Sequence, residues 1–407
     1  MERTTCAVVG GGPAGMVLGL LLARAGIDVT VLEKHNDFLR DFRGDTVHAS
    51  TVRLIDELGL GREFRKLPQS RLEVVGLPTP SGMQVIGDLK RLRPPYNYIA
   101  MVPQWDFLDL LADAGKQEPT FTLRMNTEVT GVLRDGGKIT GVRYRTAEGD
   151  EGELHADLVV ACDGRHSLLR REAGLKPQNF PVPIDVWWFR IPKPYDAVGS
   201  VQFQVKPKEF LLRLDRGDYW QGAYIGPKGR DAELRGEGVE RFRQRIAALA
   251  PDVTAEQLAT IESMDDVKVL DVQLDRLHKW HVDGMLCIGD AAHAMSPIGG
   301  VGINLAVQDA VATATLLAEK LKAGHVRPAD LAKVRRRRWL PMLAIQGLQR
   351  MMHSQLIEPV MRGDRDTYPK PVATLMKRIP ALRVVPAYVV AIGPRPEHAP
   401  AFARRSN

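Results

Sequence analysis

Three glycines near the N-terminus have the spacing of a phosphate-binding turn. Gly10, Gly12 and Gly15 follow the apolar run Cys6–Val9 and precede the helix-patterned run Met16–Arg24. Glycine permits a tight turn, and backbone N–H groups at the start of a helix bind a pyrophosphate. The spacing therefore predicts a dinucleotide site between a strand and a helix. The residues expected at the pyrophosphate are Gly10, Gly12, Pro13, Ala14 and Gly15.

An acidic residue ends the second predicted strand. Glu33 stands 18 residues after Gly15, near the roughly 20 expected for a carboxylate that binds a ribose hydroxyl. We expect Glu33 and its neighbour Lys34 to lie at the cofactor. Lys34, His35 and Arg40 also stand where a 2′-phosphate would be met, and a solvated surface is the alternative interpretation of these three residues.

Two further loops carry polar residues and glycines in a definite order. Asp163-Gly164 follows the apolar run Leu158–Ala161, and Gly289-Asp290 opens a segment that continues to Asn304. Together with the first glycine turn, these loops resemble those of the single-component flavoprotein monooxygenases of the para-hydroxybenzoate hydroxylase type. The resemblance covers most of the chain except residues 180–265.

The resemblance implies a bound FAD and assigns residues to it. Asp290 is expected to hydrogen-bond the ribityl chain, and the backbone amides of Gly299–Asn304 are expected to face the flavin pyrimidine edge. A glycine-rich turn at a helix N-terminus stabilises the negative charge that reduced flavin carries there. The other cofactor residues that it implies are Arg43, Gln104, Asp163, Gly164, Gly289, Gly302, Ile303 and Asn304.

A reaction is also implied by this resemblance. NADPH or NADH reduces FAD, O2 adds to flavin C4a, and the resulting C4a-hydroperoxide transfers an OH to an electron-rich aromatic substrate. The cofactor supplies the chemistry, while the protein supplies position, a dry pocket and electrostatics. The loop with Pro297, Gly299 and Gly300 is the predicted oxygen-reaction site, and no side chain need act as a nucleophile.

The histidines do not predict catalysis or a metal site. In the resembled family, the position of His293 supports the loop and is not an acid or base, so we interpret His293 as structural. His278 and His281 are three residues apart, but no third ligand is near them in the sequence.

The elements that position these motifs predict an α/β fold (α+β overall). It consists of a Rossmann-like FAD-binding domain with an inserted, mostly antiparallel β-sheet domain. Residues 1–72, 98–180 and 268–407 are expected to form the FAD-binding domain, and residues 73–97 and 181–267 the substrate-binding sheet. Ligand sites tend to form where two such domains meet.

Substrate contacts are expected from the inserted sheet. Successive residues of a strand point to opposite faces, so Trp188 and Arg190 share one face of Val186–Ile191 and Trp187 shares the other with Phe189. The pattern leaves open which face lines the pocket. The benzoate-binding residues of the resembled family have no counterpart that we can place, which argues against a small benzoate and leaves a larger phenol, a quinolone-like ring or a polyketide open as the substrate. The candidate contacts are Trp188, Arg190, Phe203, Trp220 and Tyr224, with core packing as the alternative for Phe203, Trp220 and Tyr224.

Three alternative functions remain open at this point. The segment Trp187–Pro192 nearly matches the W-x-W-x-I-P signature of flavin-dependent halogenases, with Phe189 in place of the second tryptophan. A halogenase would receive reduced flavin from a separate reductase. A flavin reductase or dehydrogenase would turn over without incorporating oxygen. A non-catalytic FAD-binding protein would hold flavin that no nicotinamide reduces.

Composition sets the wider limits. A chain of 407 residues that is 44% hydrophobic buries a large core and favours two domains. Its net charge of +7 suits anionic partners, yet no nucleic-acid signature occurs, and the basic run Arg335–Arg338 is interpreted as a solvated helix face. We expect no membrane-spanning segment. Cys6, Cys162 and Cys287 lie in strand-like apolar runs, which fits a reducing cytoplasm. We expect a monomer or homodimer.

Overall fold

The computed structural model describes residues 1–39, 46–79, 82–193, 201–206, 208–363, 378 and 380–406. Two residues of the sequence predictions, Arg40 and Arg43, lie outside this described part.

The largest sheet has eight strands and holds the first glycine turn at its centre. Strands β20, β11, β1, β2 and β8 are neighbours in that order and run parallel, while β19, β10 and β9 pair antiparallel. Among the parallel strands, β2 and β20 are short and buried throughout, as expected for strands covered on both faces. The bounds are β1 Glu2–Val9, β2 Val29–Leu32, β8 Phe121–Arg124, β9 Thr127–Asp135, β10 Lys138–Thr146, β11 Glu151–Ala161, β19 His281–Val282 and β20 Met285–Cys287.

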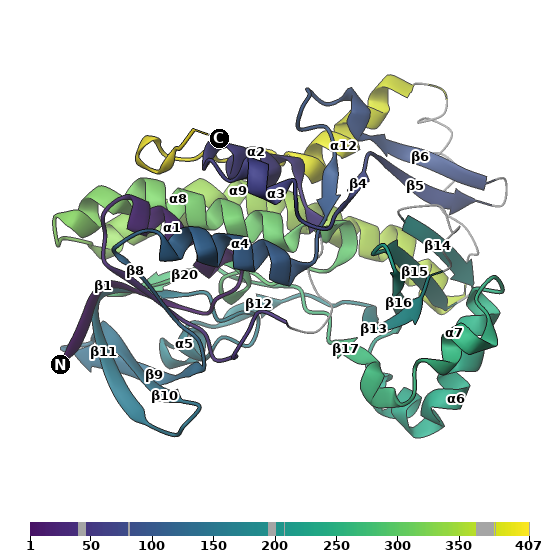
Figure 1. Cartoon of the computed structure of the whole chain (residues 1–407), viewed down its shortest axis with the longest axis horizontal. Helices are drawn as coiled ribbons and strands as arrows, with labels where there is room; N and C mark the ends of the chain where they lie inside the picture. Colours follow the sequence, from purple (N-terminus) through teal and green to yellow (C-terminus); the bar gives the residue numbers. More distant parts are fainter. Residues whose placement is uncertain are drawn as a thin grey trace.

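Four long helices form a layer over one face of this sheet (Figure 1). They are α1 Pro13–Arg24, α4 Gln104–Lys116, α8 Gly302–Lys322 and α9 Pro328–Met352. Helix α8 lies between α1 and α9, so it is apolar on most of its surface. The segment Ile298–Lys322 is long and apolar enough to cross a membrane, but 78% of its most apolar window is buried inside the protein. That burial is typical of a core helix.

The second sheet has five antiparallel strands in the order β14, β15, β16, β13 and β17. Two helices, α6 Asp231–Leu249 and α7 Ala255–Ala259, follow its strands at the right of Figure 1. Helix α6 is kinked at Gly238, which has a φ of 83°. The strand bounds are β13 Ile184–Pro192, β14 Val201–Lys206, β15 Glu209–Asp215, β16 Tyr219–Pro227 and β17 Lys268–Leu270.

The five-stranded sheet packs on both faces. Trp187, Phe189 and Ile191 join a separate core with Phe242 of α6, whereas Val186 and Trp188 pack with the main core of the molecule. The alternation expected for β13 is therefore present, and the structure assigns each face.

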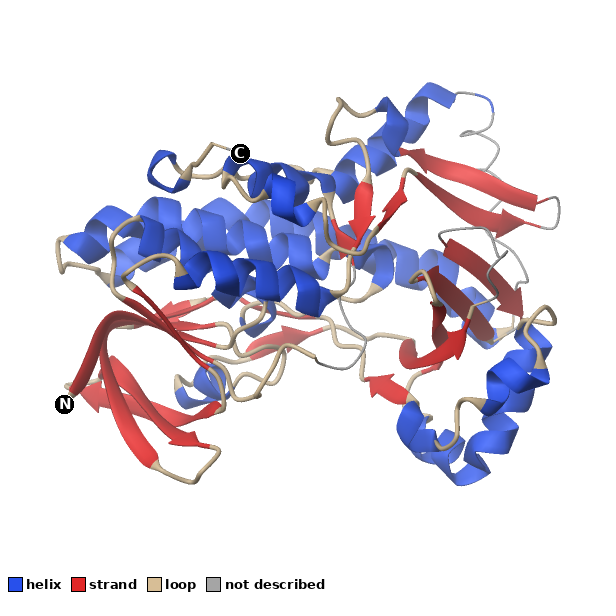
Figure 2. Cartoon of the chain, viewed as in Figure 1, coloured by secondary structure: helices blue, strands red, loops and turns tan. Residues whose placement is uncertain are grey.

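Shorter elements complete the fold (Figure 2). Parallel and antiparallel sheets in one chain, with helices layered on them, confirm the predicted fold class. These elements are α2 Ala49–Glu57, α3 Gly61–Phe64, α5 Leu168–Glu172, α10 Glu358–Arg362, α12 Val384–Ala391, β3 Thr46–Val47, β4 Ser70–Leu72, β5 Val74–Thr79, β6 Gly82–Asp88, β7 Ile99–Met101, β12 Pro177–Asn179 and β18 Asp275–Leu277, with short 3-10 or π turns at η1 Leu89–Arg91, η2 Met264–Asp266, η3 Gly289–Ala291, η4 Ile298–Gly300, η5 His353–Ile357, η6 Pro380–Arg383 and η7 Ala401–Ala403.

Candidate functional site

The turn between β1 and α1 accepts only glycine at two positions. Gly10 has a φ of 104°, and a Cβ placed on it would lie 2.4 Å from the carbonyl oxygen of Cys162. A Cβ on Gly15 would lie 1.9 Å from the carbonyl oxygen of Gly10. Real Cβ atoms are not found at such distances, so the close approach of these backbones requires glycine.

The N-terminus of α1 is open to an anion. Its N-cap, Gly12, provides no side-chain cap, and the first turn contains no acidic residue. A Cβ built on Gly12 would meet nothing within 4 Å, so this side of the turn is not packed against the chain. Among the described residues, the N–H groups of Gly12, Ala14 and Gly15 have no hydrogen-bond acceptor in the protein. The helix dipole and these donors suit a phosphate group.

Glu33 is buried directly beside this turn. Its Oε2 accepts a hydrogen bond of 2.7 Å from the backbone N–H of Gly11, and its Oε1 lies 2.5 Å from His35 Nδ1. Glu33 as a whole is only 2% exposed to solvent. Lys34, in contrast, points to solvent and makes no ion pair within the described part of the chain. The turn and the carboxylate therefore form one unit, and Lys34 stands outside it.

The three sequence motifs meet at Gly289. A Cβ on Gly289 would lie 3.3 Å from the Cβ of Ala14 in α1 and 3.2 Å from that of Ala306 in α8. Gly289 therefore lies between the first turn of α1, at Ala14, and the N-terminal part of α8, at Ala306. Gly10 contacts the second motif at Cys162 and Asp163, and Arg165 Nη2 reaches Asp290 Oδ2 at 3.5 Å. Residues far apart in the sequence thus share one site.

Asp163 organises the second motif from within. Its Oδ1 accepts a 2.5 Å hydrogen bond from Ser167 Oγ, and its Oδ2 accepts one of 3.1 Å from the N–H of Leu169 in α5. Burial raises the pKa of Asp163. Gly164 has a φ of 82° and open space at its Cβ position. The carboxylate holds the turn, while Gly164 leaves a backbone surface exposed.

The segment before α8 is a second glycine turn. Gly299 and Gly300 have φ values of 81° and 63°, and the hydroxyl of Thr46 donates a 2.8 Å hydrogen bond to the carbonyl of Gly300. Helix α8 begins at Gly302 without a side-chain cap or an acidic residue in its first turn. Two uncapped helix N-termini, those of α1 and α8, therefore adjoin at Gly289.

The side chain of Asn304 acts as a brace rather than as a free group. Its Oδ1 accepts hydrogen bonds from Ser50 Oγ at 3.0 Å and Thr51 Oγ1 at 2.5 Å, both in α2. Ile303 is buried in the core, so only its backbone can serve a ligand. These contacts fix the position of the first turn of α8.

The loop around Pro297 is held by the end of α9, which the sequence motifs did not reveal. Gln349 Nε2 donates to the carbonyls of Ser296 (2.8 Å) and Ile298 (2.9 Å), and its Oε1 accepts from the N–H of Ser296 (3.2 Å). His353 Nε2 lies 2.9 Å from Ser296 Oγ, and burial lowers the pKa of His353 to about 4. No sequence signal linked positions more than 50 residues apart, because the link depends on how α9 packs.

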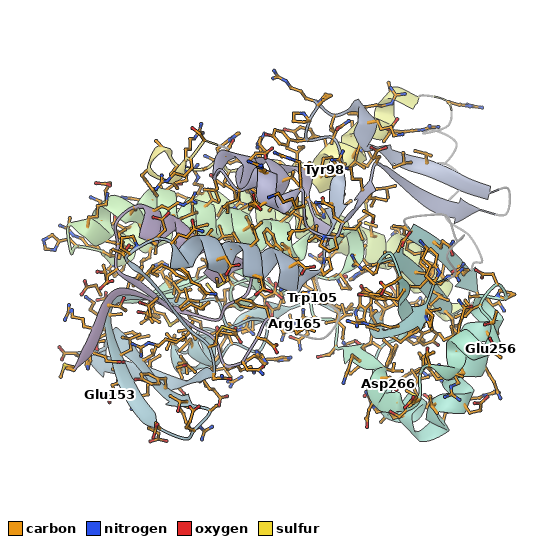
Figure 3. The ribbon with its side chains drawn as sticks, viewed as in Figure 1. Tyr98, Trp105, Glu153, Arg165, Glu256 and Asp266 are labelled. Atoms are coloured by element: carbon orange, nitrogen blue, oxygen red, sulfur yellow. The ribbon has the colours of Figure 1, made fainter. Side chains whose placement is uncertain are left out.

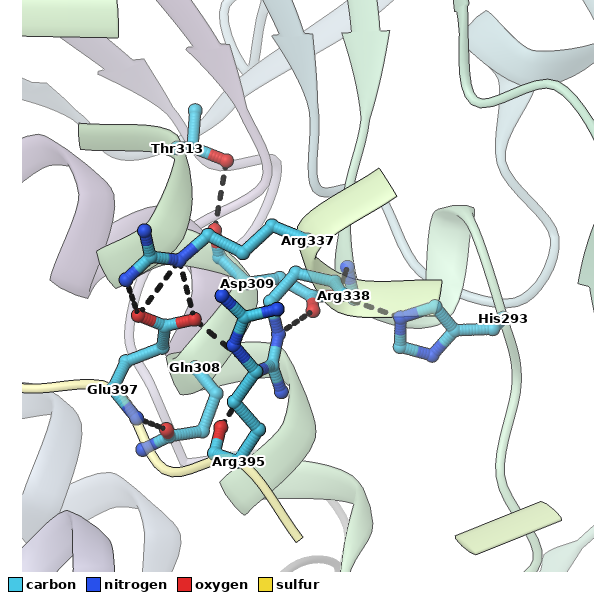
Figure 4. Close-up of polar contacts among 9 residues, drawn as sticks. His293, Gln308, Asp309, Thr313, Arg337, Arg338, Arg395 and Glu397 are labelled. Carbon is cyan, nitrogen blue, oxygen red and sulfur yellow. Dashed lines mark hydrogen bonds and ion pairs between the residues drawn. The ribbon is translucent and has the colours of Figure 1, made fainter. Parts of the chain in front are cut away.

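A buried ionic network lies behind Gly289 (Figure 4). Asp309 Oδ2 accepts from the N–H of Gly289 at 3.2 Å and lies 2.6 Å from His293 Nε2, while its Oδ1 accepts from Arg338 Nε at 3.0 Å. Arg338 also reaches Glu397 Oε1 at 3.4 Å. His293 is therefore placed as loop support, consistent with its structural interpretation.

The contacts within this network favour the charged forms of His293 and Asp309. Burial favours the neutral imidazole of His293, but the nearby Asp309 carboxylate outweighs it and raises the pKa of His293. Burial also opposes ionisation of Asp309, yet His293 and Arg338 together lower its pKa. A buried charge is tolerated only where partners of opposite charge contact it, as here.

The five-stranded sheet divides the candidate substrate residues between its two faces. Trp188 and Arg190 share a face with Phe203, because Trp188 pairs with Ala223, Ala223 with Leu212, and Leu212 with Phe203. That face packs towards the main core. The guanidinium of Arg190 lies 4.8 Å from the ring of Tyr219 and 5.9 Å from that of Trp105, beside Gln104. Figure 3 shows Trp105 between the two sheets.

Trp220 and Tyr224 belong to the opposite face, where their contacts are those of the alternative interpretation, core packing. Both are at most 2% exposed and pack in the core beneath α6. Tyr224 donates a 2.7 Å hydrogen bond to Glu209, and burial raises its pKa. Their position in β16 places them in register with Trp187 and Ile191, so the alternation of the strand directs them away from the motifs.

A cavity of about 810 Å³ lies elsewhere, along β9, β10 and β11. Its wall carries both charge signs, from Arg134 and Lys138 and from Glu153 and Asp157, and it includes none of the predicted site residues. Among the described residues, no group of three His, Cys, Asp or Glu side chains is arranged to hold a metal ion.

Comparison with known proteins agrees with this geometry. The model of the FAD binding domain family matches residues 3–339, and the chain therefore belongs to that family. The 6-methylpretetramide 4-monooxygenase of Streptomyces rimosus is 32% identical over 387 residues, which cover 94% of this chain and 91% of that protein. The resemblance predicted from the motifs is confirmed: the chain is an FAD-dependent monooxygenase, with FAD as cofactor and NAD(P)H as reductant.

Solved structures show the same fold. The anhydrotetracycline hydroxylase OxyS from Streptomyces rimosus aligns with a TM-score of 0.76 at 21% identity, covering 96% of this chain and 76% of that one. PqsL of P. aeruginosa in complex with 2-aminobenzoylacetate aligns with a TM-score of 0.75, also at 21% identity, covering 89% and 99%.

Proposed function

We propose that this enzyme hydroxylates a fused-ring phenolic small molecule with NAD(P)H and O2. The observation that carries the proposal is the meeting of two uncapped helix N-termini, α1 and α8, at Gly289. One suits the pyrophosphate of FAD and the other its flavin ring. The fused-ring preference is supported by the relatives, which are named for 6-methylpretetramide and anhydrotetracycline.

The proposed cofactor contacts follow from this arrangement. The open turn at Gly12 and Ala14 receives the pyrophosphate, and Glu33 receives the adenosine ribose. Asp290, at the start of the third motif, receives the ribityl chain. When bound, FAD accepts a hydride from NAD(P)H and activates O2. Asp163 positions Gly164, and Gln104 meets the flavin from the start of α4, where its side chain is half-buried. Arg43 remains a proposed contact from outside the described residues.

The protein's own part in catalysis is to position and to exclude water. Gly299, Gly300 and Gly302 present N–H donors to the edge where negative charge develops in reduced flavin. The Pro297 loop faces the reacting side and keeps its shape through Gln349 and Ser296. Trp188, Arg190 and Phe203 line the substrate side from the five-stranded sheet. No side chain needs to donate electrons or form a covalent bond.

The halogenase signature has a structural explanation. In the segment Trp187–Pro192, Trp187 donates a 2.8 Å hydrogen bond to Asp231 Oδ1 and lies in the core under α6, while Trp188 lies on the opposite face. The two tryptophans are therefore neighbours in sequence on different faces of the sheet. Nothing in this arrangement favours halogenation over hydroxylation.

Further proposals concern organisation and setting. We propose that residues 1–72, 98–180 and 268–407 form the FAD-binding domain, and residues 73–97 and 181–267 the substrate domain. Buried Cys6 and Cys287 and partly buried Cys162 are free thiols, which suits a reducing cytoplasm. NADPH and NADH both remain candidate donors, and a monomer or homodimer is proposed.

The reductive half-reaction tests this function. The purified holoenzyme would be mixed anaerobically with NADPH or NADH, with and without a panel of monocyclic and fused-ring phenols, while flavin absorbance is recorded. We expect bleaching that one nicotinamide drives and that a fused-ring phenol accelerates. Flavin that neither nicotinamide bleaches under any condition contradicts a self-sufficient hydroxylase and favours an enzyme fed by a reductase.

A further inference from the structure

A group of cations stacks on two aromatic rings on and beside α9, and none of these residues is among those proposed to bind flavin. The arginine–aromatic cluster consists of Arg276, His278, Arg335 and Arg350 around Phe180 and Trp339. Arg276 Cζ lies 4.8 Å from the ring centre of Phe180, and Arg350 Cζ lies 4.5 Å from it. Arg335 Cζ lies 4.0 Å from the ring of Trp339. His278 packs against Trp339 with ring centres 5.8 Å apart.

This cluster has no carboxylate. Within the described part of the chain, Arg276, Arg335, Arg350 and neighbouring Lys279 form no ion pair with Asp or Glu. Its polar partner is the neutral Gln178, whose Oε1 accepts from Arg276 Nη2 at 3.2 Å and lies 3.1 Å from His278 Nε2. Arginines elsewhere in the protein form ion pairs with carboxylates: Arg245, for example, contacts both Glu209 and Glu237.

The cations also repel one another. Burial and the charge of Arg350 lower the pKa of Arg276. Burial, followed by the charges of Lys279 and Arg335, lowers the pKa of nearby His281. The Nε atoms of Arg276 and Arg335 are buried and have no hydrogen-bond partner. Like charges held together with unused donors are unfavourable unless an anion joins them.

We propose that the arginine–aromatic cluster binds a phosphate-bearing anion. A guanidinium stacked on a ring keeps its edge free, and that edge matches phosphate oxygens in a bidentate geometry. Stacking on Phe180 and Trp339 also orders the arginines before the ligand arrives. The phosphate belongs either to a small soluble molecule or to a lipid headgroup. Exposed Leu340 (72%) and Met351 (54%) on the same helix make the lipid source testable.

The test compares holoenzyme variants with matched charge. The cluster variant is Arg276→Gln with Arg350→Gln, and the control is Arg62→Gln with Arg241→Gln, two exposed arginines outside the cluster. Thermal unfolding would be followed in chloride, inorganic phosphate or ADP at constant ionic strength. Co-sedimentation with phosphatidylcholine vesicles, with and without phosphatidylglycerol, forms the second arm. Flavin absorbance confirms that each variant is folded and loaded.

Two results support the proposal and identify the source. In the first, phosphate or ADP raises the unfolding temperature of the wild type and the control variant. In the second, vesicles with phosphatidylglycerol retain these two proteins. In both, the cluster variant should bind at least about tenfold more weakly. In chloride, the cluster variant should unfold at no lower temperature than the wild type, because the repulsion between Arg276 and Arg350 has been removed. Arg276→Lys should bind with intermediate affinity, because lysine keeps the positive charge but cannot make the bidentate contact of a guanidinium. Equal responses of cluster and control variants, or no binding by the wild type in either arm, overturn the proposal.

Discussion

The flavin-side loops and the five-stranded sheet define their ligand surfaces in different ways. At the loops, the shape depends on backbone: Gly10, Gly15 and Gly289 lie where a Cβ would collide, and donors come from N–H groups. At the sheet, the surface depends on which side chain occupies each register position, as with Trp188 and Tyr224 on opposite faces. A backbone site tolerates little change and serves one cofactor, whereas a side-chain surface can be altered to serve another substrate.

The largest expected effect concerns the network that supports the loop side. Asp309→Ala leaves His293 and Arg338 buried without their shared carboxylate, so the free energy of unfolding should fall by about 3–5 kcal/mol. Denaturant titration measures this change. Asp113→Ala, on an exposed side chain of α4, is the control and should change stability by less than about 0.5 kcal/mol. A loss below about 1 kcal/mol for Asp309→Ala would show that the network is not a support.

A substitution at the open turn should separate cofactor binding from folding. Gly12→Val adds a side chain where the chain itself has no atoms within 4 Å, so the apoprotein should keep its stability. The added methyl groups would occupy the space of the pyrophosphate, and the Kd of FAD should rise about 100-fold. Flavin fluorescence titration measures the Kd. Gly236→Val, also at an open position, is the control, and equal Kd values for the two variants contradict the proposed phosphate contact.

The hydrogen bonds that hold the Pro297 loop, the proposed oxygen-reaction site, should govern the coupling of NAD(P)H oxidation to hydroxylation. Gln349→Leu removes three hydrogen bonds to Ser296 and Ile298, so the loop should shift while FAD stays bound. We expect the fraction of NAD(P)H oxidised that yields hydrogen peroxide instead of product to rise about tenfold. The rate of anaerobic flavin reduction should stay unchanged, which a general loss of structure would not permit. Unchanged coupling contradicts a positioning role for Gln349.

The two faces of the five-stranded sheet should respond oppositely to substitution. Arg190→Gln should raise the KM of the substrate by about five- to tenfold with little loss of stability, because the side chain is exposed beside Trp105. Tyr224→Phe should lower stability by about 1 kcal/mol through the lost bond to Glu209 and leave KM unchanged. Steady-state kinetics and thermal unfolding measure both. A KM change in Tyr224→Phe alone reverses the assignment of the faces.

The smallest effect is the pH dependence that His293 introduces. Its pKa is raised in the folded state, so the stability that its proton contributes is fully present below the unfolded value of about 6.5. That contribution is lost as the pH rises through the higher folded pKa. The stability advantage of the wild type over His293→Gln should therefore shrink as the pH increases. A constant difference between the two proteins across this range indicates that His293 is neutral in the fold.

The sequence was sufficient for the backbone-defined part of the molecule. The order of strand, glycine turn and helix around Gly10–Gly15 is visible in spacing alone. Side-chain partners at long range were not visible, because Glu397 reaches Arg338 and Gln349 reaches Ser296 only through helix packing. Alternation in β13 predicted two faces, but placing Trp220 and Tyr224 on the face beneath α6 required the structure.

Incorporation of labelled oxygen tests the central claim most directly. The holoenzyme would turn over with its preferred nicotinamide and a fused-ring phenol under 18O2, and the product mass would be measured. One 18O atom in a new hydroxyl group, with stoichiometric NAD(P)H oxidation, is the predicted result. Steady NAD(P)H oxidation with an unlabelled or unchanged phenol would contradict hydroxylation and indicate a non-oxygenating flavin oxidoreductase.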